Sequence, residues 1–236
     1  MAWVSLRLCV PVIWLKNGPA FVSPASPVVF IVDDDPSICR SLLRLVRQSG
    51  LEGHSYGSAE EFIEAQKAPL ARPACLVVDL QMPGIGGLEL QQHLQAAPAR
   101  CPMIFISGNG DIPSTVKAMK HGAVTFLTKP FDNADLLHAI GEALERHRDE
   151  LSVTRQVTQV RDRMSALTER ELQVMSWIIT GALNKQIAAE LDIVEKTVKV
   201  HRARVLEKMQ AQSVAELVRL CSLAGFDAAT SGSAAG

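Results

Sequence analysis

The stretch VVFIVDDDPS, residues 28–37, decides the fold of the first half of the chain. A run of five apolar residues is followed by three carboxylates and then by Pro36, a residue type that is tolerated in the first turn of a helix. This order predicts a buried strand, a polar strand end and a helix start in direct succession. Because similar units recur downstream, we expect the region to consist of βα repeats.

Five short runs are predicted as strands, and amphipathic stretches with helical spacing separate them. Such spacing is seen at Ile38, Leu42 and Leu45, and again at Ile112, Val116 and Met119. Strands that are apolar throughout are usually covered by helices on both faces, so these runs predict a parallel α/β fold of about 120 residues. The predicted strands are Val28–Val32, Leu51–Tyr56, Cys75–Val78, Met103–Ile106 and Val124–Leu127.

The composition of the whole chain limits the classes of protein to which it can belong. The 236 residues are 47% hydrophobic and 21% charged, which favours two folded domains. A net charge of −1 excludes both a polybasic nucleic-acid coat and a disordered acidic chain. The five cysteines are scattered and form no C-x-x-C pair, so neither a disulfide framework nor a zinc site is predicted, and a cytoplasmic location is expected.

Residues 1–27 form a separate apolar segment that Arg7 and Pro11 interrupt. Its longest uncharged apolar run, Leu8–Leu15, is far shorter than the roughly 20 residues that a bilayer crossing needs, so no membrane association is expected. A secretory signal is the less favoured alternative, because a basic start and a small-x-small cleavage site are missing. We interpret the segment as a disordered tail or as the product of a start codon placed too far upstream.

A long helix is predicted from Asn133 to about Met164. Along its second half Val153, Val157, Val160 and Met164 recur at spacings of four, three and four residues. This short seam is compatible with two interpretations: pairing with a second copy of the chain, or a solvated linker helix that lies on its own domain.

The region Leu167–Phe226 is predicted to contain four short helices. Thr168–Glu171 and Ser213–Glu216 both have the pattern of a capping box, and Asn184 is expected to cap a helix between them. The helix predicted at Glu195–Met209 follows a tight turn. The sequence therefore predicts an all-α domain after the α/β domain.

Polar residues stand directly after four of the predicted strands. Asp33, Asp34 and Asp35 follow the first strand, Asp79 follows the third, Ser107 follows the fourth, and Lys129 with Pro130 follows the fifth. Ligands collect at the carboxyl ends of strands in such sheets. Several carboxylates on one rim repel each other, and a hard cation such as Mg²⁺ relieves that repulsion, so a metal is expected here.

These segments resemble the receiver domain of two-component response regulators, which has a flavodoxin-like fold. The resemblance covers roughly Val28 to His147 and rests on FIVDDD (Phe30–Asp35), VVDLQMPGIGG (Val77–Gly87), IFISGNGD (Ile104–Asp111) and FLTKPF (Phe126–Phe131). It implies that Asp79 is the phosphoacceptor, that Ser107 contacts the phosphoryl group and that Lys129 neutralises it. The implied Mg²⁺ ligands are Asp33, Asp34, Asp79 and the backbone carbonyl of Gln81, and the implied switch residues are Ser107, Phe126 and Pro130.

Physical chemistry supports these roles. A carboxylate attacks phosphorus to give an acyl phosphate, a cation and a lysine stabilise the charge on the transferring oxygens, and a proline after the lysine can fix a cis bond. The face from Ile112 to Phe131 is expected to change shape on phosphorylation, and in this family that face commonly forms the active dimer.

A phosphatase of the haloacid-dehalogenase type is a remote alternative, because such enzymes also use acidic residues at the first strand end together with Ser and Lys. Their further acidic ligands follow the lysine, however, whereas Asp79 precedes Lys129. A second alternative is an orphan receiver that a ligand or protein partner controls without phosphorylation.

The helix predicted at Glu195–Met209 has two distinct faces. Lys196, Lys199, Val200 and Ala203 share one face, while Val198, Val205 and Met209 share the opposite one. A short helix, a tight turn and a second helix with basic residues near its start describe a helix-turn-helix, whose second helix enters the major groove of DNA.

Three segments of this region resemble the LuxR-type DNA-binding domain: LTERELQVM (Leu167–Met175), GALNKQIAAELDI (Gly181–Ile193) and KTVKVHRARVLEKM (Lys196–Met209). The resemblance implies that Lys199 and Val200 face base edges, with Ala203 beside them. The candidates for backbone contacts or for support of the helix are Asn184, Lys185, Thr197, His201, Arg202 and Arg204, and Lys196 is a further DNA-binding candidate. Lysine can donate to guanine, and Val200 or Ala203 can meet a thymine methyl group.

Taken together, these features resemble the FixJ-like branch of response regulators. The expected protein is a transcription factor that a sensor histidine kinase activates by phosphorylating Asp79, and it is not an enzyme apart from its own phosphoryl transfer and dephosphorylation. Phosphorylation is expected to favour a homodimer that binds promoter DNA and acts on RNA polymerase. The predicted divisions are a tail at 1–27, a receiver domain at 28–147, a linker helix at 148–165, a helix-turn-helix domain at 166–226 and a disordered tail at 227–236.

Overall fold

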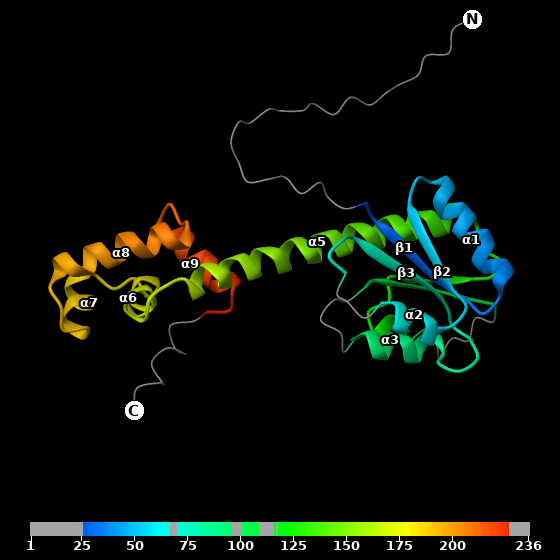
Figure 1. Cartoon of the computed structure of the whole chain (residues 1–236), viewed down its shortest axis with the longest axis horizontal. Helices are drawn as coiled ribbons and strands as arrows, with labels where there is room; N and C mark the ends of the chain where they lie inside the picture. Colours follow the sequence, from blue (N-terminus) through cyan, green and yellow to red (C-terminus); the bar gives the residue numbers. More distant parts are fainter. Residues whose placement is uncertain (1–25, 67–69, 96–100, 109–115, 117, 227–236) are drawn as a thin grey trace, which may run out of the picture.

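A computed structural model describes residues 26–66, 70–95, 101–108, 116 and 118–226. The long helix α5 (Asn133–Ser165) joins an α/β body to a helical body, which lie at its two ends (Figure 1). None of the helices in these residues is long and apolar enough to cross a membrane. The predicted tails at 1–27 and 227–236 lie almost entirely outside the described residues.

The sheet of the α/β body is parallel throughout and has the strand order β2-β1-β3-β4-β5. It confirms the predicted α/β class. Its strands are β1 (Val28–Val32), β2 (Glu52–Tyr56), β3 (Ala74–Asp79), β4 (Met103–Ser107) and β5 (Thr125–Thr128). Two strands run one residue further than predicted, so that Asp79 and Ser107 are the last residues of β3 and β4. Both residues are therefore held by the hydrogen-bonded ladder.

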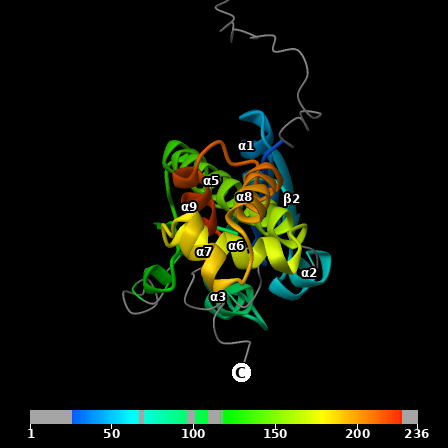
Figure 2. The ribbon, with the colours of Figure 1, turned by 90° about the vertical axis from the view of Figure 1, so that its left-hand side faces the viewer.

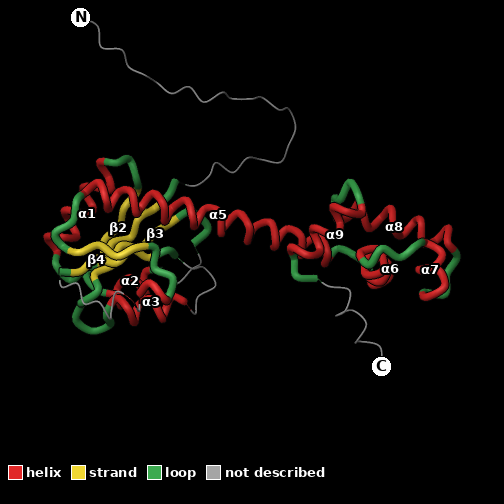
Figure 3. Tube along the Cα trace, turned by 180° about the vertical axis from the view of Figure 1, so that it is seen from behind, coloured by secondary structure: helices red, strands yellow, loops and turns green. Residues whose placement is uncertain are grey.

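Helices cover both faces of the sheet, as the continuously apolar strands predict. Helices α1 (Pro36–Gln48) and α5 lie on one face, and α2 (Ala59–Ala65) and α3 (Gly87–Gln95) lie on the other (Figures 1 and 3). Side chains of β1 alternate between the two cores: Phe30 packs with Phe62 of α2, whereas Ile31 packs with Leu42 of α1. The helix predicted around Ile112 falls mostly outside the described residues.

The helical body consists of α6 (Glu169–Ile179), α7 (Asn184–Glu190), α8 (Glu195–Met209) and α9 (Val214–Leu223). Figure 2, viewed along the molecule, shows these helices grouped around the end of α5. Val160 of α5 is buried in their common core, and Met164 packs against it. Val153, by contrast, is 51% exposed. The predicted seam is thus divided, because its second half packs into the helical body and its first half does not.

The segment predicted as a linker helix is the second part of α5, which runs without a break from the sheet into the helical body, as the helix predicted from Asn133 to about Met164 requires. Arg161 and Arg163 donate to the carbonyls of Ala224 and Met209, at 3.4 and 3.3 Å. These carbonyls lie at the C-terminal ends of α9 and α8, where a cation is favoured. The last turns of α5 are therefore fixed to the helical body.

The predicted caps of this body are only partly correct. The Thr168–Glu171 box is complete, with both hydrogen bonds present. At Ser213 only half of the box forms, because the Glu216 carboxylate accepts from the Gln212 N–H at 2.9 Å. The prediction for Asn184 was wrong: it is the first helical residue of α7, and the Gln186 side chain accepts from the Leu183 N–H instead.

Candidate functional site

An acidic rim forms where the strands end. Asp33 follows β1 and is 1% exposed, and Asp79 at the end of β3 is 6% exposed. Lys129, which follows β5, places its Nζ 2.7 Å from Asp33 Oδ2 and 2.9 Å from Asp79 Oδ1. The backbone N–H of Lys129 also donates to the Ser107 carbonyl at 2.7 Å. One ammonium group therefore bridges two buried carboxylates.

Burial and the neighbouring charges shift the pKa values at this rim in opposite directions. Burial raises the pKa of Asp79, and the hydrogen bond from Lys129 only partly offsets that effect. Burial alone would lower the pKa of Lys129, but the Asp33 and Asp79 carboxylates outweigh it and hold the pKa above its usual value. Lys129 is thus protonated at neutral pH, and the rim keeps one positive charge between its two buried carboxyl groups.

The three consecutive aspartates have different environments. Asp33 Oδ1 accepts from the Asp35 N–H at 2.8 Å, which turns the chain directly after β1. Asp35 caps α1 by accepting from the Ser37 N–H at 2.7 Å, and this hydrogen bond lowers the pKa of Asp35. Asp34 is exposed beside the rim. Only Asp33 and Asp34 are therefore free of a capping role.

The loop after β3 contributes backbone groups to the rim. The Gln81 N–H donates to Asp79 Oδ2 at 3.2 Å, so each oxygen of Asp79 has one partner. Gly87, at the far end of this loop, has no room for a side chain, because a Cβ there would lie 2.5 Å from the Asp79 carbonyl oxygen. The loop consequently packs directly on the backbone of the strand that carries Asp79.

The oxygen donors fit a hard cation. Asp33, Asp34, Asp79 and the Gln81 carbonyl supply carboxylate and carbonyl oxygens, the ligand types that Mg²⁺ prefers. Within the described residues no group of three or more His, Cys, Asp and Glu side chains is already assembled around a common point. Lys129 bridges Asp33 and Asp79 here, so a bound cation would share these carboxylates with the ammonium group.

Two of the predicted switch residues lie on β4 and β5, and the third, Pro130, follows β5. Ser107 is fully buried, and Phe126 of β5 is half-buried against the core that α2 and α3 cover. The Lys129–Pro130 bond is cis, as the sequence predicts. Of the face from Ile112 to Phe131, residues 112–115 and 117 lie outside the described residues.

Sequence reasoning missed two side chains that hold this body together. His147 of α5 is 2% exposed, and its Nδ1 lies 2.9 Å from the Ala74 N and 3.0 Å from the Ala74 O, at the start of β3. Glu60 of α2 accepts from the Ile85 N–H at 3.0 Å, in the loop after Asp79. No local pattern marks either contact, because the partners are 73 and 25 residues apart.

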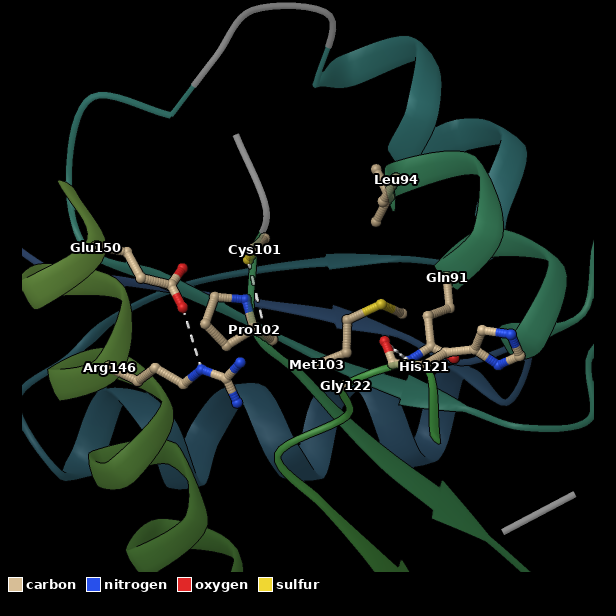
Figure 4. Close-up of a pocket in the computed structure, with 9 residues that line it drawn as sticks. All are labelled: Gln91, Leu94, Cys101, Pro102, Met103, His121, Gly122, Arg146 and Glu150. Atoms are coloured by element: carbon tan, nitrogen blue, oxygen red, sulfur yellow. Dashed lines mark hydrogen bonds and ion pairs between the residues drawn. The ribbon is translucent and has the colours of Figure 1, made fainter. Parts of the chain in front are cut away.

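A pocket of about 210 Å³ lies around the start of β4, at the end of the strand opposite to Ser107 (Figure 4). Gln91 projects into this region from α3 and donates to the Ala118 and His121 carbonyls at 3.1 and 3.3 Å. Arg146 and Glu150 of α5 form an ion pair at 3.1 Å on the opposite side. The pocket is lined by Gln91, Leu94, Cys101, Pro102, Met103, His121, Gly122, Arg146 and Glu150.

Helix α8 has the two faces that its sequence predicts. Val198, Val205 and Met209 are fully buried in the core of the helical body. The opposite face is exposed and carries Lys196, Lys199, Val200, Ala203 and Arg204. Val200 on this face is 45% exposed, so its side chain is open to a partner. The geometry is that of a helix with one side available for insertion into a groove.

The remaining candidate residues divide into exposed and supporting positions. Lys185 is exposed, whereas Asn184, Thr197 and Arg202 are half-buried. Arg202 Nη1 lies 3.5 Å from Asn184 Oδ1, which connects α8 to the start of α7. His201 is also half-buried, and within the described residues its buried Nδ1 has no hydrogen-bond partner.

Each half of the chain matches a known protein family. Residues 29–141 match the response regulator receiver domain, and residues 165–221 match the luxR family of bacterial regulatory proteins. The chain belongs to the two-component transcriptional response regulators that combine these two domains. Both matches are regulatory domains, and membership implies a kinase partner and binding to DNA.

Individual relatives fall in the predicted branch. Nodulation protein W of Bradyrhizobium diazoefficiens is 42% identical over 91% of this chain and 94% of its own length. The transcriptional regulatory protein FixJ of Azorhizobium caulinodans is 42% identical over 86% of this chain and 95% of its own length. The response regulator protein TodT of Pseudomonas putida is 40% identical over 87% of this chain and 89% of its own length.

Two solved structures cover both bodies. The response regulator StyR has a TM-score of 0.76 at 42% identity and covers 84% of this chain and 99% of its own. Full-length FixJ from B. japonicum has a TM-score of 0.51 at 37% identity and covers 84% of this chain and 97% of its own. Receiver domains of this family generally bind Mg²⁺ for phosphorylation, which agrees with the oxygen donors at the rim.

Proposed function

We propose that a sensor histidine kinase phosphorylates this regulator on Asp79, and that phosphorylation controls its binding to promoter DNA. The observation that carries this proposal is the single ammonium group of Lys129 between two buried carboxylates, Asp33 and Asp79. Lys129 thereby keeps a positive charge next to the Asp79 oxygen at which a transferred phosphoryl group would add negative charge.

The residues of the rim have complementary roles in the transfer. An Asp79 carboxylate oxygen would attack the phosphorus of the donor and form a new O–P bond. The bond from phosphorus to the donor would break, and the donor group would leave with the electron pair of that bond. Lys129 is already 2.9 Å from Asp79 Oδ1 and neutralises charge on the transferring oxygens. Ser107 ends the neighbouring strand β4, and its hydroxyl would donate to the phosphoryl group.

Asp33, Asp34, Asp79 and the Gln81 carbonyl would hold Mg²⁺ at this rim. When bound, Mg²⁺ supplies positive charge that lowers the repulsion between the carboxylates and the incoming phosphoryl oxygens. The protein's own contribution is to fix Asp79. Its Oδ2 accepts from the Gln81 N–H, and its backbone is packed against Gly87.

The exposed face of α8 is proposed to enter the major groove. Lys199 and Val200 would read base edges with Ala203 beside them, while Lys185, Lys196, Thr197 and Arg204 would contact the backbone. Arg202 and Asn184 contact each other, so they would support the orientation of α7 and α8 as well as meet phosphates.

A homodimer places two copies of α8 at half-sites about one DNA turn apart. We propose that the dimer forms on phosphorylation through the face that ends at Phe131, that it acts on RNA polymerase, and that the protein works in the cytoplasm. Val116 and Met119, each 45% exposed on that face, support a role in association.

The first experiment compares the full-length protein with and without acetyl phosphate and Mg²⁺, by intact mass and by size-exclusion light scattering. The proposal expects one phosphoryl adduct and a doubled molar mass. An adduct on a protein that stays monomeric would reject the dimer and move the switch to release of the DNA-binding domain. The absence of an adduct would reject phosphorylation and favour an orphan receiver, in which a ligand or protein partner controls DNA binding.

A further inference from the structure

A side chain of α2 binds the backbone of the loop between Asp79 and α3. Glu60 Oε1 accepts from the Ile85 N–H at 3.0 Å, a charge-assisted hydrogen bond between elements 25 residues apart. The hydrogen bond of Glu60 with its own backbone N–H and, to a smaller extent, the bond from Ile85 lower the pKa of Glu60, so the side chain is charged at neutral pH. A charged side chain outside the loop therefore holds the loop by a hydrogen bond.

The neighbouring glycine shows how closely this carboxylate packs on the loop. Gly84 has a φ of +75°, and a Cβ at Gly84 would lie only 2.5 Å from Glu60 Oε1. The carboxylate thus occupies the space that a side chain at position 84 would need. The left-handed conformation and the lack of a side chain both bring the loop backbone against Glu60.

The same loop carries the groups that meet Asp79. The Gln81 N–H donates to Asp79 Oδ2 at 3.2 Å, and the Gly87 N–H donates to the Leu80 carbonyl at 3.1 Å. The loop is therefore fixed at its two ends by Asp79 and Leu80, and near its tip by Glu60. Met82 of the loop is also buried in the core, but loss of the Glu60 contact leaves the Ile85 N–H without its hydrogen bond to α2, in the same loop as Gln81.

We propose that Glu60 is a positioning residue for the phosphorylation site: through the Ile85 N–H it holds the loop so that the Gln81 backbone faces the rim where Mg²⁺ binds. This inference rests on the proposed function, because it assumes that the Gln81 carbonyl is a metal ligand. Glu60 itself does not touch the reacting atoms. Outer groups that orient a ligand commonly change metal affinity strongly even though they never contact the metal.

The test measures Mg²⁺ dependence in the full-length protein. Glu60→Ala is expected to raise the half-saturating Mg²⁺ concentration for phosphorylation by acetyl phosphate about three- to tenfold, while the final adduct remains one phosphoryl group. Glu60→Gln keeps an acceptor oxygen and should stay within about twofold of the unaltered protein. Calorimetric titration of the unphosphorylated protein with Mg²⁺ alone should show the same ranking.

A matched control is available on the same helix turn. Glu61 accepts from the Gly57 N–H at 2.8 Å within the cap of α2 and does not bond to the loop after Asp79. Glu61→Ala therefore removes a comparable carboxylate–backbone bond, and we expect no change in Mg²⁺ dependence. Thermal unfolding of both variants separates loss of stability from loss of positioning.

Each outcome decides for or against the inference. Equal Mg²⁺ dependence in Glu60→Ala and the unaltered protein would overturn it, and so would equal shifts in Glu60→Ala and Glu61→Ala. If Mg²⁺ binds with the expected ranking but no adduct forms, the positioning role stands while the proposed phosphorylation fails. Absence of Mg²⁺ binding in the unaltered protein would reject both.

Discussion

The acidic rim and the outer face of α8 are assembled in opposite ways. The rim gathers Asp33, Asp79 and Lys129 from three strand ends, with Lys129 and Asp33 96 residues apart, and its carboxylates are buried and share one ammonium group. The face of α8 takes Lys196 and Lys199 from one helix, where both are exposed. Groups that share a partner in a buried site are strongly coupled, whereas separate exposed side chains act almost independently.

The largest effect is expected at the phosphoacceptor. Asp79→Asn replaces the nucleophilic oxygen with an amide of nearly the same shape, so phosphorylation should be abolished while the fold remains intact. Intact mass after treatment with acetyl phosphate and Mg²⁺ measures phosphorylation, and circular dichroism with thermal unfolding checks the fold. A phosphoryl adduct on this variant would place the phosphoacceptor elsewhere.

Coupling within the rim is tested through Lys129. Lys129→Ala leaves Asp33 and Asp79 without their shared cation, and the rate of phosphorylation should fall about 100-fold or more. The double variant Asp33→Asn, Lys129→Ala should lose much less than the product of the two single losses, because Asp33 and Lys129 act on the same charge balance. If the loss of rate in the double variant equalled the product of the two single losses, the rim residues would act independently, and the contrast with α8 would disappear.

Independence on α8 is tested with DNA. Lys199→Ala should weaken binding to an operator selected from random sequences by about 1–3 kcal/mol. The loss of binding free energy in the Lys196→Ala, Lys199→Ala double variant should equal the sum of the two single losses within about 0.5 kcal/mol, because each side chain contacts its own part of the duplex. Filter binding or anisotropy measures both, and Lys185→Ala is the control that should weaken operator and random DNA alike. Equal losses on the two DNAs for Lys199→Ala would place Lys199 on phosphates.

The same contrast explains how much of the molecule the sequence could predict. Most of the strands were predicted because they are short apolar runs, whereas the run at β2 is weaker, and α8 was predicted because its two faces follow helical spacing. The positions of Asp33, Asp79 and Lys129 followed from one rule, that parallel strands end at a common edge. These features depend on residues that are close in sequence or on one simple property of the fold.

The features that were missed depend on contacts distant in sequence or on competition between neighbours. Glu60 and His147 meet backbone groups 25 and 73 residues away, which no local pattern encodes. Asn184 was predicted as a cap because of its residue type, but Gln186 supplies the acceptor and Asn184 meets Arg202 instead. The domain boundaries stay a prediction, since α5 crosses the predicted border without interruption.

The smallest predicted effect concerns an ion pair in the helical body, which resembles the acidic rim in joining a buried carboxylate to a lysine. Glu171 is 2% exposed and pairs with Lys208 Nζ at 2.6 Å, and this hydrogen bond, together with that from the Thr168 N–H, lowers the pKa of Glu171 to about 2. Because the folded-state pKa lies below the ordinary value of 4.5, the stabilisation is fully present above about pH 4.5 and is lost as the pH falls toward 2.

Glu171→Gln should therefore reduce the free energy of unfolding at pH 7 by about 1–2 kcal/mol, and the difference from the unaltered protein should shrink below pH 4.5. Urea unfolding followed between pH 3 and pH 7 measures this difference, with the fluorescence of Trp177 reporting on the helical body. Glu169→Gln, at an exposed position of the same helix turn, is the control and should leave the profile almost unchanged. If Glu171→Gln and Glu169→Gln gave the same profile, the Lys208 pair would contribute nothing to stability, and strong coupling would be confined to the acidic rim.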